Sequence, residues 1–287
     1  MTYEEMLQIC ALLVQMGIDK IRITGGEPFV RKDIMQFLTA LSKLNGLNEL
    51  TITTNGVLTA PHVKELKEIG VRSVNLSLDT LDAVRFFNIT RRDEFASVMA
   101  TMDELLKHNV EVKINAVVMD GKNTQDIIPL VELAKELPVS VRFIEEMPFN
   151  GDGHVYGGLK WDYVRILEEI KDKYPNIKKI TDAEYSTSYN YHIPGHRGSV
   201  GIIAAYSRTF CGTCNRIRIT PVGGLKTCLY DDGVLNVKDL IRQGSSEDNL
   251  KMLLQGTFSN RAADGWEAER LRVEHKGVHE SMATIGG

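Results

Sequence analysis

Little cysteine, no long apolar run and no excess of basic charge characterise this chain of 287 residues. Four cysteines are too few for a disulfide framework. Together with the lack of a signal peptide, they favour a reducing cytosol or organelle matrix. No apolar stretch approaches the roughly 20 residues that span a membrane. A net charge of −4 excludes a global basic field for nucleic acid or membrane, so any anion site must be built locally.

Short β-branched runs alternate with amphipathic helical stretches through the first half of the sequence. Strand starts recur roughly every 24–38 residues, a spacing typical of βαβ units with right-handed crossovers. Thr2 and Glu5 form a capping box for the first helix. We predict strands at 20–24, 49–54, 73–77, 111–119 and 140–145, and helices at 3–16, 32–43, 60–68, 93–107 and 124–136.

Polar and glycine residues gather where the predicted strands end, as in Gly25-Gly26-Glu27 and Asn55-Gly56. Barrels assemble their active sites from such loops at the carboxyl ends of strands. The G-x-G-x-x-G of a dinucleotide-binding fold is absent after the first strand. The pattern therefore favours an α/β fold of the partial (β/α) barrel type. Because the series begins with a helix, we expect a first strand to be missing at the N-terminus.

The pattern changes beyond Trp161. A helix at 161–173 precedes short β-like runs at 189–194, 199–206, 216–220 and 224–229, and helices at 237–242 and 247–254 follow. We therefore predict two domains, the barrel at 1–150 and a C-terminal α+β extension at 159–287. A glycine-rich loop, Pro148–Gly158, joins them.

Three cysteines of this extension form the most informative motif. Cys211, Cys214 and Cys228 stand as C-x2-C-x13-C, and thiolates are soft ligands that suit a metal centre. One interpretation is an iron–sulfur cluster, which normally takes four cysteines, so that three leave one iron open. Another is a structural zinc site completed by His192 or His196. The spacing alone leaves both open, with free thiols as a third alternative.

Cys10 stands apart from those three thiols. Met6, Ile9 and Leu13 share its helical spacing. We therefore expect Cys10 to be a core residue of the first helix.

Basic residues lie on one face of several predicted strands, by the period of two along a strand. Alone, each is typical of a salt-bridge partner. Together they favour a phosphate-bearing substrate, because Arg and Lys both bind phosphate oxygens. They are Lys20 and Arg22 on the first strand, Lys113 on the fourth, Arg142 on the fifth, and Arg216 and Arg218 beside the cysteines.

The motifs together resemble a known family. Gly25-Gly26-Glu27-Pro28 is similar to the GGEP motif of radical S-adenosylmethionine (SAM) enzymes. The wider set resembles the GTP 3′,8-cyclases of molybdenum cofactor biosynthesis over essentially the whole chain, and this resemblance favours iron–sulfur over zinc. The matching stretches are KIRITGGEP, LTITTNG, VNLSLD, RFIEEM, CGTCNRIRIT and a terminal Ile-Gly-Gly.

The resemblance implies a role for each matching residue. Cys211, Cys214 and Cys228 would hold a C-terminal [4Fe–4S] cluster, and Gly286-Gly287 would reach toward the active site. The GTP site would comprise Arg22, Thr53, Lys113, Arg216, Ile217 and Arg218. The SAM site would comprise Gly26, Ser77 and Met147.

The family also implies the reaction and its partners. It would rearrange GTP to (8S)-3′,8-cyclo-7,8-dihydroguanosine 5′-triphosphate, using SAM, and pass the product to cyclic pyranopterin monophosphate synthase. We expect a cytoplasmic protein, or one of the mitochondrial matrix if eukaryotic, with a possible homodimer and no nucleic-acid or membrane partner.

The chain departs from the family in lacking the C-x3-C-x2-C motif that binds the SAM-cleaving cluster. We therefore expect a fragment, with a second [4Fe–4S] cluster only in the full-length protein. The alternative is a catalytically inactive relative that binds GTP and one cluster. A peptide-modifying radical SAM protein is disfavoured, because such proteins usually carry more C-terminal cysteines than the three found here.

Overall fold

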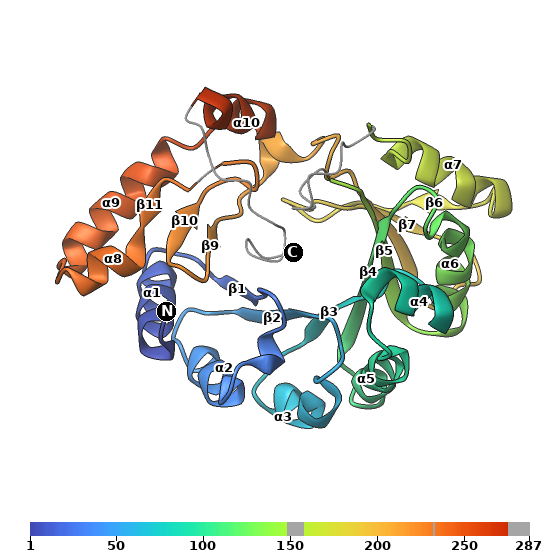
Figure 1. Ribbon diagram of the computed structural model, residues 1–287, viewed down its shortest axis with the longest axis horizontal. Helices are drawn as coiled ribbons and strands as arrows, with labels where there is room; N and C mark the ends of the chain where they lie inside the picture. The colour runs from blue at the N-terminus through green and yellow to red at the C-terminus, as the bar shows by residue number, and fades with distance from the viewer. Residues whose placement is uncertain (148–157, 232, 275–287) are drawn as a thin grey trace. The chain divides into compact units, whose positions relative to one another are not determined.

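The computed structural model describes residues 1–147, 158–231 and 233–274 (Figure 1). The chain divides into two compact units. Among the described residues, the first unit comprises 1–51 and 211–274, and the second comprises 52–147 and 158–210. Each unit therefore contains segments that are distant in sequence. No helix in these described ranges is both long and apolar enough to cross a membrane.

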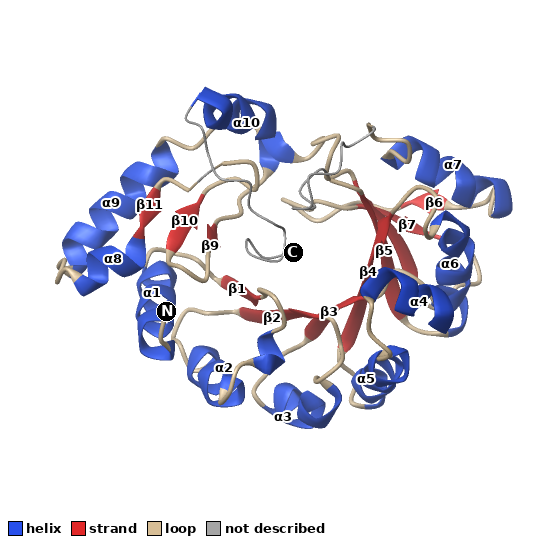
Figure 2. Ribbon diagram, viewed as in Figure 1, coloured by secondary structure: helices blue, strands red, loops and turns tan. Residues whose placement is uncertain are grey.

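The first unit combines the N-terminal helices with a small antiparallel sheet in the order β11–β10–β9, visible in Figure 2. Its core forms because Ile9 and Leu13 share one face of α1 and pack against Leu225, Val237 and Leu254 of the C-terminal segment. The elements are α1 (Tyr3–Gln15), β1 (Lys20–Ile23), η1 (Pro28–Val30), α2 (Ile34–Ser42), η4 (Cys211–Thr213), β9 (Arg218–Ile219), β10 (Gly224–Lys226), β11 (Leu235–Asn236), α8 (Val237–Arg242), α9 (Glu247–Ser259) and α10 (Gly265–Glu274), with β2 (Glu49–Thr54) beginning here.

The second unit contains a mixed sheet whose strands follow the order β2–β3–β4–β5–β8–β7–β6. The pairs from β2 through β5 to β8 are parallel, and β7 and β6 are antiparallel. Its elements are η2 (Ala60–His62), α3 (Val63–Glu68), β3 (Ser73–Ser77), α4 (Ala83–Thr90), α5 (Phe95–Lys107), β4 (Glu111–Val118), η3 (Thr124–Asp126), α6 (Ile127–Glu136), β5 (Val139–Glu145), α7 (Tyr163–Lys173), β6 (Lys178–Lys179), β7 (Tyr189–His192) and β8 (Ser199–Ile203).

The strand register places polar side chains in rows across this sheet. Thr53 pairs with Asn75 and Asn75 with Lys113, which makes one row. Ser77 pairs with Asn115, which makes a second row nearer the strand ends. Because β4 alternates between fully buried and partly exposed residues, the members of these rows share the less buried face.

Most predicted elements are confirmed, including the capping box, in which Glu5 N donates to Thr2 Oγ1 over 3.2 Å. The α/β fold, the mixed sheet and the C-terminal extension are present. The structure adds α4, α10, β6 and β11, which were not predicted. The predicted domain boundaries, and a partial barrel lacking its first strand, stay predictions. Part of the glycine-rich loop (148–157) and the Gly286-Gly287 tail lie outside the described residues.

Candidate functional site

Three arginines gather in the first unit. Arg22 comes from β1, and Arg216 and Arg218 come from the segment that leads into β9. Desolvation and the charges of Arg216 and Arg218 lower the pKa of Arg22 to about 10. The Arg22 residue as a whole is nevertheless exposed. Desolvation and Arg216 likewise lower the pKa of Arg218. Like charges that lower one another's pKa lie close together, and an anion between them would remove the repulsion.

The charges of Arg22 and Arg218 are compensated only in part by their contacts. Arg22 Nε donates to Thr51 Oγ1 over 3.4 Å, a long hydrogen bond to a neutral group. The Glu49 carboxylate raises the pKa of Arg22, and the Asp231 carboxylate raises that of Arg218. Both effects are smaller than those of desolvation and the neighbouring arginines.

Lys20, which the sequence placed on the same strand face as Arg22, has a different environment. Its Nζ lies 2.7 Å from the carboxylate of Glu49, and both side chains are well exposed. Lys20 therefore belongs to a surface ion pair, whereas Arg22 belongs to the arginine cluster.

The three site cysteines lie in the same unit as half-buried thiols that form no disulfide. Cys214 N donates to Cys211 O over 3.2 Å, which closes the turn of η4. Burial raises the pKa of Cys228, and the neighbouring Cys211 and Cys214 contribute to the rise. The charges of Cys214 and Cys228 also raise the pKa of Arg218. The thiols therefore interact with one another and with the arginine cluster.

This donor set suits an iron–sulfur cluster chemically, because three mutually interacting thiols are soft ligands. Among the residues with described side chains, no three Cys, His, Asp or Glu gather closely enough to hold a metal ion. His196, named in the zinc alternative, is buried in the second unit and packs edge-on against Tyr174 at 5.1 Å. The assignment of a cluster to Cys211, Cys214 and Cys228 is therefore taken up as a proposal.

Sequence reasoning missed Asp231, which organises the loop around Cys228. Its Oδ2 accepts from Cys228 N at 2.8 Å and from Thr227 N at 2.7 Å. Its Oδ1 accepts from Gly233 N at 2.9 Å. Tyr230 N in turn points at Cys228 Sγ over 3.5 Å. An Asp three residues after a Cys is a local turn signal that the sequence does contain.

Gly26 follows β1 in an open position. A Cβ placed on Gly26 would meet nothing within 4 Å, and Gly25 has φ +140°, which favours glycine. Glu27 accepts from Phe29 N over 3.1 Å, which fixes the turn into η1. The backbone at Gly26 is therefore accessible to a ligand.

In the second unit, Thr53 and Lys113 lie in one row with Asn75 between them. Asn75 Nδ2 donates to Thr53 Oγ1 over 3.2 Å, and Arg142 donates to Asn75 Oδ1. Lys113 Nζ lies 3.0 Å from Glu111. The structure therefore links Thr53 to Arg142 through Asn75, which the sequence did not single out, and gives Lys113 a carboxylate partner.

Ser77 lines a cavity of about 200 Å³ together with Asp79 and Asn55. Desolvation raises the pKa of Asp79 to about 6, although its carboxylate accepts from Val117 N over 2.8 Å. Met147, the third residue predicted to contact SAM, lies in the same unit two residues after β5 ends.

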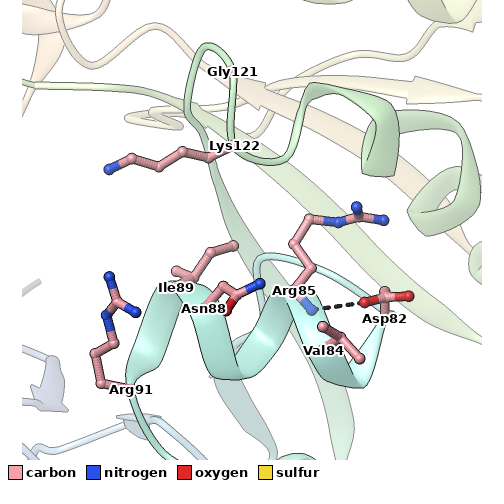
Figure 3. Close-up of a pocket in the computed structure, with 8 residues that line it drawn as sticks. All are labelled: Asp82, Val84, Arg85, Asn88, Ile89, Arg91, Gly121 and Lys122. Carbon is pink, nitrogen blue, oxygen red and sulfur yellow. Dashed lines mark hydrogen bonds between the residues drawn. The ribbon is translucent and has the colours of Figure 1, made fainter.

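A larger cavity, of about 430 Å³, lies over α4 and contains none of the predicted site residues. Figure 3 shows the Arg91 and Lys122 side chains on one side of it and Arg85 on the other. Arg85 lies 2.5 Å from the buried Asp126. Asp82 accepts from Arg85 N at 2.7 Å, as the N-cap of α4.

Comparison with known proteins agrees with this fold. Residues 1–134 match the radical SAM superfamily, and residues 139–265 match the family Molybdenum Cofactor Synthesis C. The crystal structure of Streptococcus suis SuiB superposes with a TM-score of 0.62 at 17% identity, covering 98% of this chain and 70% of that chain. The fold and these matches define a radical SAM α/β protein with a molybdenum cofactor synthesis region.

The chain belongs to the GTP 3′,8-cyclase family. It is 38% identical to the mitochondrial GTP 3′,8-cyclase of Arabidopsis thaliana, covering 100% of this chain and 73% of the relative. It is 38% identical to the enzyme of Chlorobaculum tepidum, covering 99% and 84%. Molybdenum cofactor biosynthesis protein 1 of Dictyostelium discoideum is 40% identical over 92% of this chain, which spans 42% of that relative's length.

Proposed function

We propose that the chain binds GTP and takes part in its conversion to the 3′,8-cyclised triphosphate, the first step of molybdenum cofactor biosynthesis. The arginine cluster of Arg22, Arg216 and Arg218 is the observation that carries this proposal. Arg216 and Arg218 lower the pKa of Arg22, and Arg216 lowers that of Arg218, so the three guanidinium groups form a ready site for a polyanion such as a triphosphate. The names of the relatives supply the particular nucleotide.

The family resemblance predicts further residues for GTP. Ile217 stands between Arg216 and Arg218 in the sequence, and Thr53 and Lys113 offer a hydroxyl and a cation in one row of the second unit. Gly26, Ser77 and Met147 would contact SAM, and Cys211, Cys214 and Cys228 would hold a [4Fe–4S] cluster. Bound SAM and a reducing cluster, for which this sequence carries no C-x3-C-x2-C motif, would supply the radical chemistry. The chain's own arginines would bind the triphosphate.

Equilibrium binding of GTP to the chain and to Arg216→Ala and Arg218→Ala variants tests the proposal. Each loses charge-assisted hydrogen bonds, so we expect affinity to fall about 10- to 100-fold. Lys20→Ala is the matched control, because Lys20 is a cation of the same unit already bound to Glu49. Equal GTP affinity in all four proteins would remove the arginine cluster from the site.

Metal content tests the cluster separately. After anaerobic reconstitution, we expect iron and sulfide with no zinc, lost on Cys228→Ala and retained on Arg218→Ala. Zinc in place of iron would overturn the assignment.

One feature of the sequence favours a second candidate, a GTP- and cluster-binding relative without activity. The chain carries four cysteines and no C-x3-C-x2-C motif. Cleavage of SAM by the reduced, reconstituted chain separates the two: formation of 5′-deoxyadenosine supports the enzyme, and GTP binding without cleavage supports the relative. The downstream synthase, a homodimer and a compartment stay predictions.

A further inference from the structure

Glu145 is a buried carboxylate that the proposed chemistry does not use. Only 1% of its surface is exposed, and it is the last residue of β5. Burying an ionised carboxylate is costly unless hydrogen bonds satisfy its oxygens. A hydrophobic side chain of similar size would fill the position without this desolvation cost. A buried carboxylate here therefore indicates a role beyond packing.

Three donors surround the carboxylate, from two segments distant in sequence. Tyr163 N donates to Oε1 over 2.8 Å, and Tyr163 is the first residue of α7. Ser207 N donates to Oε2 over 2.7 Å, and Ser207 Oγ donates to Oε1 over 2.8 Å. Both oxygens of the carboxylate therefore accept hydrogen bonds, from a helix N-terminus and from a loop.

The loop that carries Ser207 is held in shape to meet Glu145. It follows β8, which pairs in parallel with β5. Arg208 adopts φ +54°, a left-handed conformation that is uncommon for a residue other than glycine. Arg208 N donates to Ala204 O over 2.8 Å, which closes the turn and leaves Ser207 N directed at the carboxylate.

These bonds fix the point at which β5 leaves the sheet. The ladder between β4 and β5 ends where Val118 pairs with Glu145. Met147 lies two residues beyond the end of the strand. The path of Glu146 and Met147 therefore starts from a residue that is tied to α7 on one side and to the loop after β8 on the other.

We propose that Glu145 is a positioning residue for SAM: its carboxylate sets the backbone path through which Met147 reaches the cofactor. This inference rests on the proposed function, in which Met147 contacts SAM. Glu145 itself does not touch the cofactor. It acts through the end of β5, as hydrogen-bonded supporting groups act on the residues that bind a ligand directly.

Glu145→Gln is the principal test, because it keeps the size and removes the charge. Gln offers one oxygen where two are needed, so one backbone N–H, of Tyr163 or Ser207, then faces an NH2 group. We expect SAM affinity to fall about tenfold while GTP affinity stays within about twofold. Ser207→Ala removes one of the three bonds, and we expect a smaller loss of SAM affinity, of about threefold.

Asp162→Ala is the matched control. Asp162 caps the same helix α7 by accepting from Arg165 N at 2.8 Å. We expect this variant to melt at a lower temperature and to bind SAM as the wild type does. All affinities are measured on the full, reconstituted chain well below each melting temperature. The methyl resonance of Met147, labelled with 13C, reports the position of the side chain directly.

The outcomes separate the two proposals. If the wild type binds SAM, and Glu145→Gln and Ser207→Ala bind it equally well with an unmoved Met147 signal, Glu145 only stabilises the fold and the inference is overturned. If the wild type binds GTP but not SAM, the SAM site itself is wrong and the inference goes with it. Should Glu145→Gln not fold, Ser207→Ala decides alone.

Discussion

Two groups of charged side chains, one in each compact unit, differ in how their charge is compensated. In the second unit, Arg85 lies 2.5 Å from Asp126 and Lys113 lies 3.0 Å from Glu111, and Glu145 accepts three hydrogen bonds. In the first unit, Arg22 and Arg218 have pKa values lowered by desolvation and by neighbouring arginines. These charges of the second unit are thus matched within the fold, whereas the first unit gathers like charges at a cost that a bound anion would offset.

The thiols of the first unit also differ in their surroundings. Cys10 lies on α1 and is half-buried like the other three thiols, but desolvation raises its pKa from 9.0 to about 12. Cys211, Cys214 and Cys228 are half-buried and interact with one another. Desolvation therefore makes the Cys10 thiol a weak nucleophile, while the other three are the thiols proposed to hold a cluster.

The largest expected effect separates these two kinds of thiol. Because the thiolate is the reactive form, a pKa three units higher makes Cys10 on the order of a thousandfold slower toward N-ethylmaleimide than an ordinary thiol at pH 8. Mass spectrometry of the metal-free chain measures the order of labelling. Labelling of Cys10 at the same rate as Cys211 and Cys214 would contradict its raised pKa.

In the second unit, Asp79 is a carboxylate whose charge is not matched, because desolvation is the main influence on its pKa. A folded-state pKa of about 6 against an ordinary 3.8 means that the folded chain binds more protons between those values. Wild-type stability therefore falls as pH rises through about 4 to 6 and stays low above it. We expect Asp79→Asn to be more stable than wild type at pH 7 by up to about 3 kcal/mol, and equal to it near pH 3.

Urea unfolding at both pH values measures this difference. The amide side chain introduced at this position keeps an oxygen for Val117 N, so the change isolates the charge. Asp82→Asn, an exposed carboxylate at the start of α4, is the control, with a small effect at either pH. A stability gain for Asp79→Asn that does not depend on pH would show that the charge is not its cause.

The smallest expected effect compares two lysines that both have carboxylate partners. Lys113 shares a row with Thr53 and can bind GTP if its ion pair with Glu111 breaks. Lys20 remains paired with Glu49. We expect Lys113→Met to weaken GTP binding about tenfold and Lys20→Met less than about twofold. Isothermal titration of the two variants measures the ratio, and equal losses would show that Lys113 lies outside the GTP site.

The sequence predicted most of the fold because the βα units have strong local signals. The capping box at Thr2 and the alternation along β4 are two such cases. Helix α4 was missed because its aromatic and β-branched residues have low helix propensity. The signal that does mark it is Asp82, whose side chain caps the first turn. Strand β6 is two residues long, too short to show a period.

The candidate site was predicted in part, for a different physical reason. Motif residues such as Arg22 and Arg218 are visible in the sequence, but their mutual repulsion depends on packing. The position of Asn75 between Thr53 and Lys113 depends on strand register. The bond between Glu145 and Ser207 joins residues 62 positions apart. Such long-range contacts leave no local pattern to read.

The most direct test of the arginine cluster is NMR of the chain with 15N-labelled arginine during titration with GTP. We expect the Nε–H signals of Arg22, Arg216 and Arg218 to shift together with one saturable affinity, and guanosine, which lacks the triphosphate, to leave them nearly unmoved. Saturable GTP binding with those three signals unchanged would show that the triphosphate binds elsewhere.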